Sequence, residues 1–80
     1  MGQLDNLGNA SYEKRQQRIM IIRRAFDNQE LVTVGSVVKK YGYKENTVIG
    51  WAKSGDIPLL DNTGQPVVPV TDSNRPKWLK

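Results

Sequence analysis

The 80-residue sequence contains neither cysteine nor histidine. Without cysteine, the chain has no disulfide framework and no thiolate metal site. The lack of histidine further excludes nearly every zinc site, every Ser–His or Cys–His relay and the commonest general base near neutral pH. The eight acidic residues are scattered, and no motif pairs two of them as acid and base. The sequence therefore predicts a protein that is not an enzyme and that takes no metal, cofactor or small-molecule substrate.

Long apolar runs are also absent. The longest, at residues 19–22, is far shorter than the about 20 residues of a membrane-spanning helix. Residues 1–10 lack the basic start and the apolar stretch of a signal peptide. We therefore expect a soluble, cytoplasmic protein that does not engage a membrane.

What the chain has instead is an excess of positive charge. Lysine and arginine number 12 against 8 acidic residues, which gives a net charge of +4. This excess favours an anionic partner such as nucleic acid. A chain of this length forms one small domain, which buries only about 60% of the surface that its unfolded form exposes.

Composition divides the chain into three parts. Residues 1–10 are rich in Asn and Gly and predict a flexible N-terminal arm. Residues 11–70 predict a single domain, and residues 71–80 a basic C-terminal tail. Trp78 in this tail either packs against the domain or lies in a mobile arm that contacts DNA or a partner; the large apolar area of a free Trp favours packing. Met20 and Ile21 are the expected contacts for this tail or for a second protomer.

A charged helix is predicted over residues 11–29. Ser11 is a suitable N-cap, and one stripe at helical spacing predicts the buried face: Tyr12, Ile19, Ile22 and Phe26. Lys14, Arg18 and Arg24 project elsewhere. This basic outer side is either solvated or in contact with DNA phosphates.

Two shorter helices joined by a tight turn are predicted over residues 31–55. Thr33 is the expected N-cap of the first, and Gly42 ends it in a left-handed conformation. The second runs from Lys44 or Glu45 to Ser54, and Gly55 and Pro58 end it. Apolar residues at helical spacing predict the inner faces of the pair: Val34, Val37, Val38, Tyr41, Val48, Trp51 and Ala52.

Two short helices around a tight turn are the layout of a helix-turn-helix, whose second helix enters the major groove. On the outer face of this helix, Asn46 can pair with an adenine edge, Lys53 can reach guanine or a phosphate, and Ile49 can contact a thymine methyl. Gly50 would let the backbone approach the groove floor, at a cost of about 1 kcal/mol relative to Ala. The alternative is that Asn46 caps the helix and Gly50 is merely tolerated. The expected DNA-binding residues of this helix are Lys44, Asn46, Thr47, Ile49, Gly50 and Lys53.

Residues 56–70 predict a short β-hairpin. Two apolar, β-branched stretches flank residues 61–64, which supply turn chemistry. Prolines at 58, 66 and 69 keep the strands short and at a sheet edge. Asn62 and Thr63 at the tip are expected to reach a phosphate.

Three stretches of the sequence carry a family resemblance: LVTV at 31–34, VVKKYG at 37–42 and TVIGWAKSGDIP at 47–58. Through these motifs, residues 31–70 resemble the excisionase and MerR-like winged helix-turn-helix families. It implies that Trp51 is a core residue, that residues 44–53 are the recognition helix, that the hairpin after Pro58 is the wing, and that the protein comes from a phage or mobile element. Three features depart from the family pattern: Gly50 replaces a common Arg or Lys, residues 44–46 lack small hydroxyl side chains, and the long basic helix precedes the motif.

The sequence as a whole predicts a mainly α fold with a small β-hairpin, in which an N-terminal helix leads into a winged helix-turn-helix. The predicted function is sequence-specific binding to double-stranded DNA, as an excisionase-like protein or a small transcription regulator. The alternative is a phage adaptor or terminase-small-subunit-like interaction module that binds DNA weakly. A homo-oligomer and a phage or host protein partner are compatible with either function.

Overall fold

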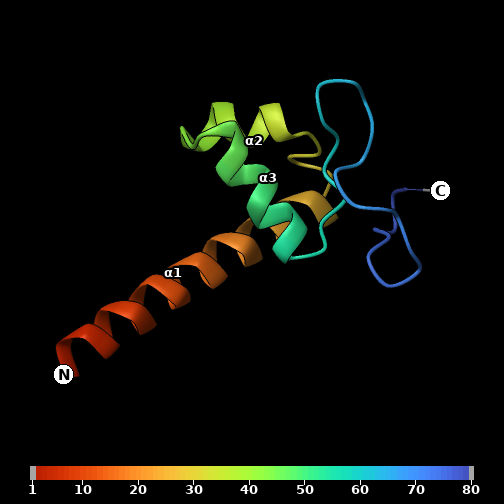
Figure 1. Cartoon of the computed structure of the whole chain (residues 1–80). Coiled ribbons are helices and arrows are strands. Elements are labelled where there is room, and N and C mark those ends of the chain that lie inside the picture. Colours follow the sequence, from red (N-terminus) through yellow and green to blue (C-terminus); the bar gives the residue numbers. More distant parts are fainter. Residues whose placement is uncertain (1, 80) are drawn as a thin grey trace.

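The computed structural model describes the backbone of residues 2–79 and the side chains of residues 12–79. This part of the chain contains three helices, α1 (Gly2–Asp27), α2 (Val34–Tyr41) and α3 (Glu45–Ser54). Helix α3 packs against both α2 and α1, and the chain after α3 continues without helices or strands to residue 79 (Figure 1). The mainly α fold is therefore confirmed. None of the described helices is both long and apolar enough to cross a membrane.

Helix α1 begins much earlier than the sequence indicated. The predicted helix start at residue 11, with Ser11 as its cap, is wrong, because the backbone of residues 2–11 is helical. The flexible arm over residues 1–10 stays a prediction, and Met1 lies outside the described residues. Once a helix is nucleated, each further residue adds one hydrogen bond, and no proline interrupts residues 2–27. The 26 residues of α1 span about 39 Å, and the N-terminal part extends beyond the other helices (Figure 1).

The core forms where α1 meets the helix pair. Ile19, Ile22 and Phe26 are buried as predicted, whereas Tyr12 is 64% exposed. Tyr12 precedes Arg15, the first described residue of α1 that bonds to α3, so no neighbouring element covers its ring. Residues from all three helices, from the loop between α1 and α2 and from the loop after α3 complete the core: Ala25, Leu31, Val34, Val37, Val48, Trp51, Ala52, Ile57 and Leu59.

The two short helices have the predicted ends. The Thr33 hydroxyl accepts the Ser36 N–H at 3.0 Å, and the Ser36 hydroxyl accepts the Thr33 N–H at 3.3 Å, which is a reciprocal capping box. Gly42 ends α2 in the left-handed region with φ of 75°, where a glycine carries no steric cost. Helix α3 ends at Gly55, whose N–H reaches the Trp51 carbonyl at 2.9 Å. Because these capping signals are local, the ends of α2 and α3 could be predicted from the sequence.

The expected β-hairpin has no regular strands within the described residues. Leu60 forms two isolated bridges, one with Thr33 and one with Pro66, but no strand develops. Proline has no N–H to donate, so Pro58, Pro66 and Pro69 stop a ladder from extending. The predicted turn does form, because the Asp61 carboxylate accepts hydrogen bonds from residues 63 and 65. The side-chain hydrogen bond from Thr63 and the backbone N–H groups hold the pKa of Asp61 below its usual value.

The C-terminal tail packs against the domain. The Trp78 Nε1 donates to the Phe26 carbonyl at 2.7 Å, and the two rings meet edge to face with centroids 5.2 Å apart. Packing of Trp78 is thus confirmed, but its expected contact with Met20 and Ile21 is wrong, because those residues stay 61% and 51% exposed. The end of α1 attracts the tail because Phe26 offers both an aromatic ring and a backbone acceptor.

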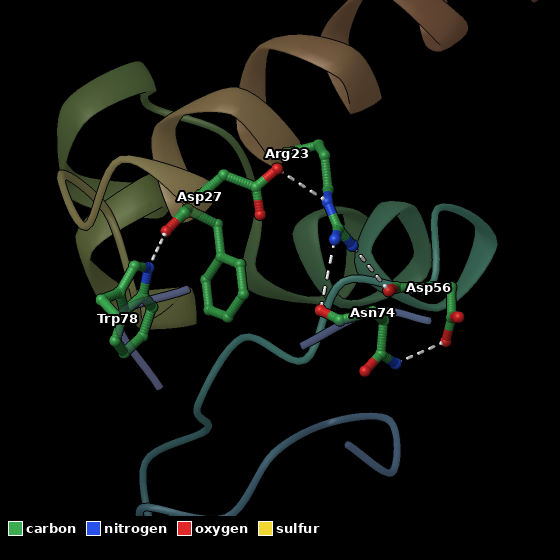
Figure 2. Close-up of polar contacts among 6 residues, drawn as sticks. Arg23, Asp27, Asp56, Asn74 and Trp78 are labelled. Atoms are coloured by element: carbon green, nitrogen blue, oxygen red, sulfur yellow. Dashed lines mark hydrogen bonds and ion pairs between the residues drawn. The ribbon is translucent and has the colours of Figure 1, made fainter. Parts of the chain in front are cut away.

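Two polar residues that the sequence did not single out hold this tail in place. Asn74 is only 1% exposed, and its amide donates to the Pro69 carbonyl at 2.9 Å and to the Asp56 carboxylate at 3.0 Å. Arg23 donates to the Asp56 and Asn74 carbonyls at 3.1 and 3.2 Å and pairs with Asp27 at 3.1 Å (Figure 2). Because Asn74 has all its polar atoms bonded, its burial carries no desolvation penalty of an unpaired group.

Candidate nucleic-acid interface

The outer face of α3 carries polar and basic side chains. Val48, Trp51 and Ala52 of this helix are buried. Asn46, Gly50 and Lys53 follow one another at spacings of four and three residues, so they share the opposite side. Asn46 and Lys53 are exposed, as are Lys44 and Thr47 nearer the start of the helix, and Gly50 is half-buried. The structure therefore places Asn46, Gly50 and Lys53 on one solvent-facing surface, which we call the outer face of α3, while Lys44 and Thr47 are exposed beside it at the start of the helix.

Asn46 is not a helix cap. The N-cap position belongs to Lys44, whose backbone is extended and whose side chain makes no capping hydrogen bond. Asn46 lies inside the first turn, with its amide exposed. The capping interpretation of Asn46 is therefore wrong, and its amide offers the donor and acceptor that an adenine edge requires. The positive end of the helix dipole and the Lys44 ammonium both favour an anion here, while Glu45 opposes it.

Gly50 faces open space. A Cβ built on this residue meets no other atom within 4 Å. Packing within the described chain thus gives no reason for a glycine, which costs about 1 kcal/mol in a helix relative to Ala. A smooth surface between Asn46 and Lys53 lets another molecule approach the helix backbone.

Ile49 lies at the border of the outer face. Its side chain is half-buried and packs against the core cluster. Only part of it is available to contact a ligand. Its position is therefore set by packing, and the proposed contact with a thymine methyl stays a prediction.

The predicted basic side of α1 divides into residues with different environments. Arg18 is exposed, yet its guanidinium lies 5.4 Å from the centre of the Tyr43 ring and 5.7 Å from that of Trp51, so it braces α1 against α3. Lys14 is exposed and lies within about 40° of Arg18 around the helix. Arg24 lies about 180° around the helix from Arg15, on the side away from α3. The structure therefore separates Arg24 from the outer face of α3.

The loop that follows Leu60 does not carry positive charge toward this surface. Asn62 and Thr63 are exposed, but the Thr63 hydroxyl donates to the Asp61 carboxylate at 2.6 Å. The loop bonds to the start of α2, where the Val34 N–H donates to the Leu60 carbonyl at 2.8 Å. Helix α3 begins beyond the far end of α2, which is about 12 Å long. Asn62 and Thr63 are thus separate from Asn46, beside a carboxylate that repels phosphate.

Two further groups contribute to the surface without having been predicted. Arg15 donates to the Ser54 hydroxyl at 2.7 Å and fastens α1 to the end of α3. Lys39 and Lys40 are exposed at the end of α2, so three lysines flank the turn between α2 and α3 when Lys44 is included. Arg15 and Arg18 lie on the stripe of Ile19 and Ile22, and this spacing was a signal that they lie on the side of α1 that faces α3.

No metal site accompanies these residues. Within the part of the chain that the structure describes, no three His, Cys, Asp or Glu residues come together in a way that could hold a metal ion. Comparison with models of protein families, with curated proteins and with solved structures finds no match to this chain.

Proposed function

We propose that this protein binds double-stranded DNA sequence-specifically, as an excisionase-like protein or a small transcription regulator, with α3 in the major groove. The observation that carries the proposal is the outer face of α3. Gly50 faces open space and lies between Asn46, whose amide does not cap the helix, and Lys53. A groove about 12 Å wide admits one helix, and a glycine at its centre lets the backbone lie close to the base edges.

Each group on this surface has a role in the proposal. Asn46, in the first turn, reads a base edge, as residues at the start of a recognition helix do. Lys53 reaches guanine or a phosphate, and the lysines at the turn (Lys39, Lys40 and Lys44) neutralise the backbone. The loop after Leu60 occupies the place of a wing in the chain order. The group that this loop offers to DNA is the Asn62 side chain, because Asp61 engages the Thr63 hydroxyl and accepts hydrogen bonds from the backbone N–H groups of residues 63, 64 and 65.

The experiment that tests this proposal is selection of preferred duplexes from a random DNA library, followed by titration of the selected duplex and a scrambled one. A sequence-specific protein of this class prefers its site by about a thousandfold or more at physiological salt. Lys53→Glu weakens binding to the selected duplex. Asp72→Asn, at an exposed residue of the tail, does not lower the DNA affinity. Equal affinity for both duplexes would contradict the proposal.

A second candidate function is an interaction module of the adaptor type, which binds DNA weakly and without sequence preference. The exposed Met20 and Ile21 on α1 favour it, because adjacent apolar side chains on a surface are typical of protein contacts. The same titration separates the two: an adaptor shows a salt-dependent affinity that is equal for both duplexes.

A further inference from the structure

The outer face of α1, on the side away from α3, carries an apolar surface that no other part of the described chain covers. Met20 and Ile21 are 61% and 51% exposed, and with Gln17 and Arg24 they line an open hollow. A second hollow begins at Ile21 and is lined by Arg18, Tyr41 and Tyr43. Figure 1 shows α2 and α3 on one side of α1, with the opposite side bare in this view.

The C-terminal tail, the segment of this chain best placed to cover that surface, is held elsewhere. Trp78 bonds to the Phe26 carbonyl at 2.7 Å, and Asn74 and Arg23 fix the preceding turn. These contacts lie at the C-terminal end of α1, beside its buried stripe. The described chain therefore leaves this apolar surface without a covering segment.

The charges that flank Met20 are arranged to fit a second copy of the same helix. Glu13, Gln17, Met20 and Arg24 recur at spacings of four, three and four residues, so they form one stripe along α1. When two such helices run antiparallel about a two-fold axis between residues 17 and 20, Glu13 faces Arg24 of the other copy, and Gln17 faces Met20. The axis generates each of these pairs twice, as in any isologous contact. Within residues 12–79 the one ion pair joins Arg23 to Asp27. Glu13 and Arg24 therefore form no ion pair within this part of the chain and can pair with charges of a second molecule.

We propose that the outer face of α1, made up of Glu13, Gln17, Met20, Ile21 and Arg24, binds the same face of a second copy of this chain in antiparallel orientation. The two helices overlap over residues 10–27, a length of about 27 Å. One helix face buries less than the about 800 Å² per partner of standard complexes. The dimer is accordingly weak, and its two exposed ion pairs make it weaker at high salt.

The test is sedimentation equilibrium without DNA, from about 1 µM to 1 mM protein, the range in which an interface of this size associates. The wild-type chain forms dimers as the concentration rises. Glu13→Arg places arginines opposite Arg24 at both ends and raises the dissociation constant about tenfold or more. Arg24→Glu acts in the same way. The double variant Glu13→Arg/Arg24→Glu restores both ion pairs and returns the dissociation constant to the wild-type value.

Two controls keep this test specific. Glu30→Arg makes the same charge change at an exposed residue outside α1 and leaves association unchanged. Met20→Lys removes the apolar centre of the stripe and abolishes the dimer, while circular dichroism shows that the helices persist. A chain that stays monomeric at 1 mM overturns the proposal and leaves the surface to a different protein. A dimer that the double variant fails to restore overturns the antiparallel arrangement. Neither outcome depends on DNA binding.

Discussion

The two faces of α3 differ in how closely other parts of the chain pack against them. On the inner face the side chains are buried against the rest of the domain: Trp51 is 8% exposed, its ring meets Tyr43 edge to face at 4.8 Å, and Arg18 lies over it. Just past the helix, a Cβ on Gly55 would collide with the Ile19 side chain. On the outer face, a Cβ on Gly50 meets nothing within 4 Å. Packing therefore accounts for the residues of the inner face but not for those of the outer face.

The largest effect is expected at the centre of the inner face. Trp51→Ala removes the side chain that joins α3 to the turn and to α1, and should cost about 3–5 kcal/mol. A domain of this size has little more stability than that, so the variant should be unfolded in circular dichroism at 25 °C. A folded Trp51→Ala variant with impaired DNA binding alone would show that Trp51 belongs to the outer face after all.

Gly55→Ala tests how closely α1 approaches the end of α3. The added methyl group collides with the Ile19 Cγ2 and lies 3.3 Å from the Trp51 carbonyl oxygen, and overpacking of this kind costs about 1–3 kcal/mol. Urea unfolding of the variant measures this loss. Ile19→Ala makes room for the methyl group, so the double variant should lose less than the sum of the two single losses. Strict additivity would mean that the two residues do not touch.

Asn46→Ala tests the outer face at its polar end. Because Asn46 caps nothing, we expect an unchanged melting temperature and a loss of about 1–3 kcal/mol of discrimination at one base pair. Nonspecific affinity, measured on a scrambled duplex, should stay the same. Asn46→Ser should not restore the preference, since a hydroxyl cannot form the bidentate pair. If Asn46→Ser behaves as the wild type on matched and mismatched duplexes, base reading by this residue is wrong.

Gly50→Ala should change stability and binding in opposite directions. The methyl group enters open space, so the helix gains about 1 kcal/mol of stability, while the selected DNA duplex is held further from the backbone and binds less tightly. Gly35→Ala is the matched control, because Gly35 is in α2 and also faces open space. It should raise the melting temperature without changing DNA affinity. Tighter or equal DNA binding by Gly50→Ala would remove the main support for the proposed interface.

The sequence was most informative where structure depends on neighbouring residues. The Thr33 cap, the left-handed Gly42 and the inner faces of α2 and α3 were all predicted, because caps and helical periodicity act within four residues. The start of α1 was not predicted. The Asn and Gly of residues 1–10 favour a loop, but propagation of the helix that includes residue 11 outweighs this preference. The hairpin was overestimated, because β-branched residues favour strands while Pro58, Pro66 and Pro69 remove the hydrogen bonds that a strand needs.

The sequence by itself determined that this is a small, basic, mainly helical chain with two short helices joined by a tight turn, because these features follow from composition and from local hydrogen bonding. For side chains to which the sequence allowed two alternative positions, only the tertiary structure decided which position is occupied. Arg18 stacks on Tyr43 and Trp51 instead of joining a free basic surface, Trp78 packs on Phe26 instead of Met20, and Asn46 is free instead of capping α3. Most of these outcomes depend on partners that are tens of residues away in the chain, and no local pattern encodes such partners.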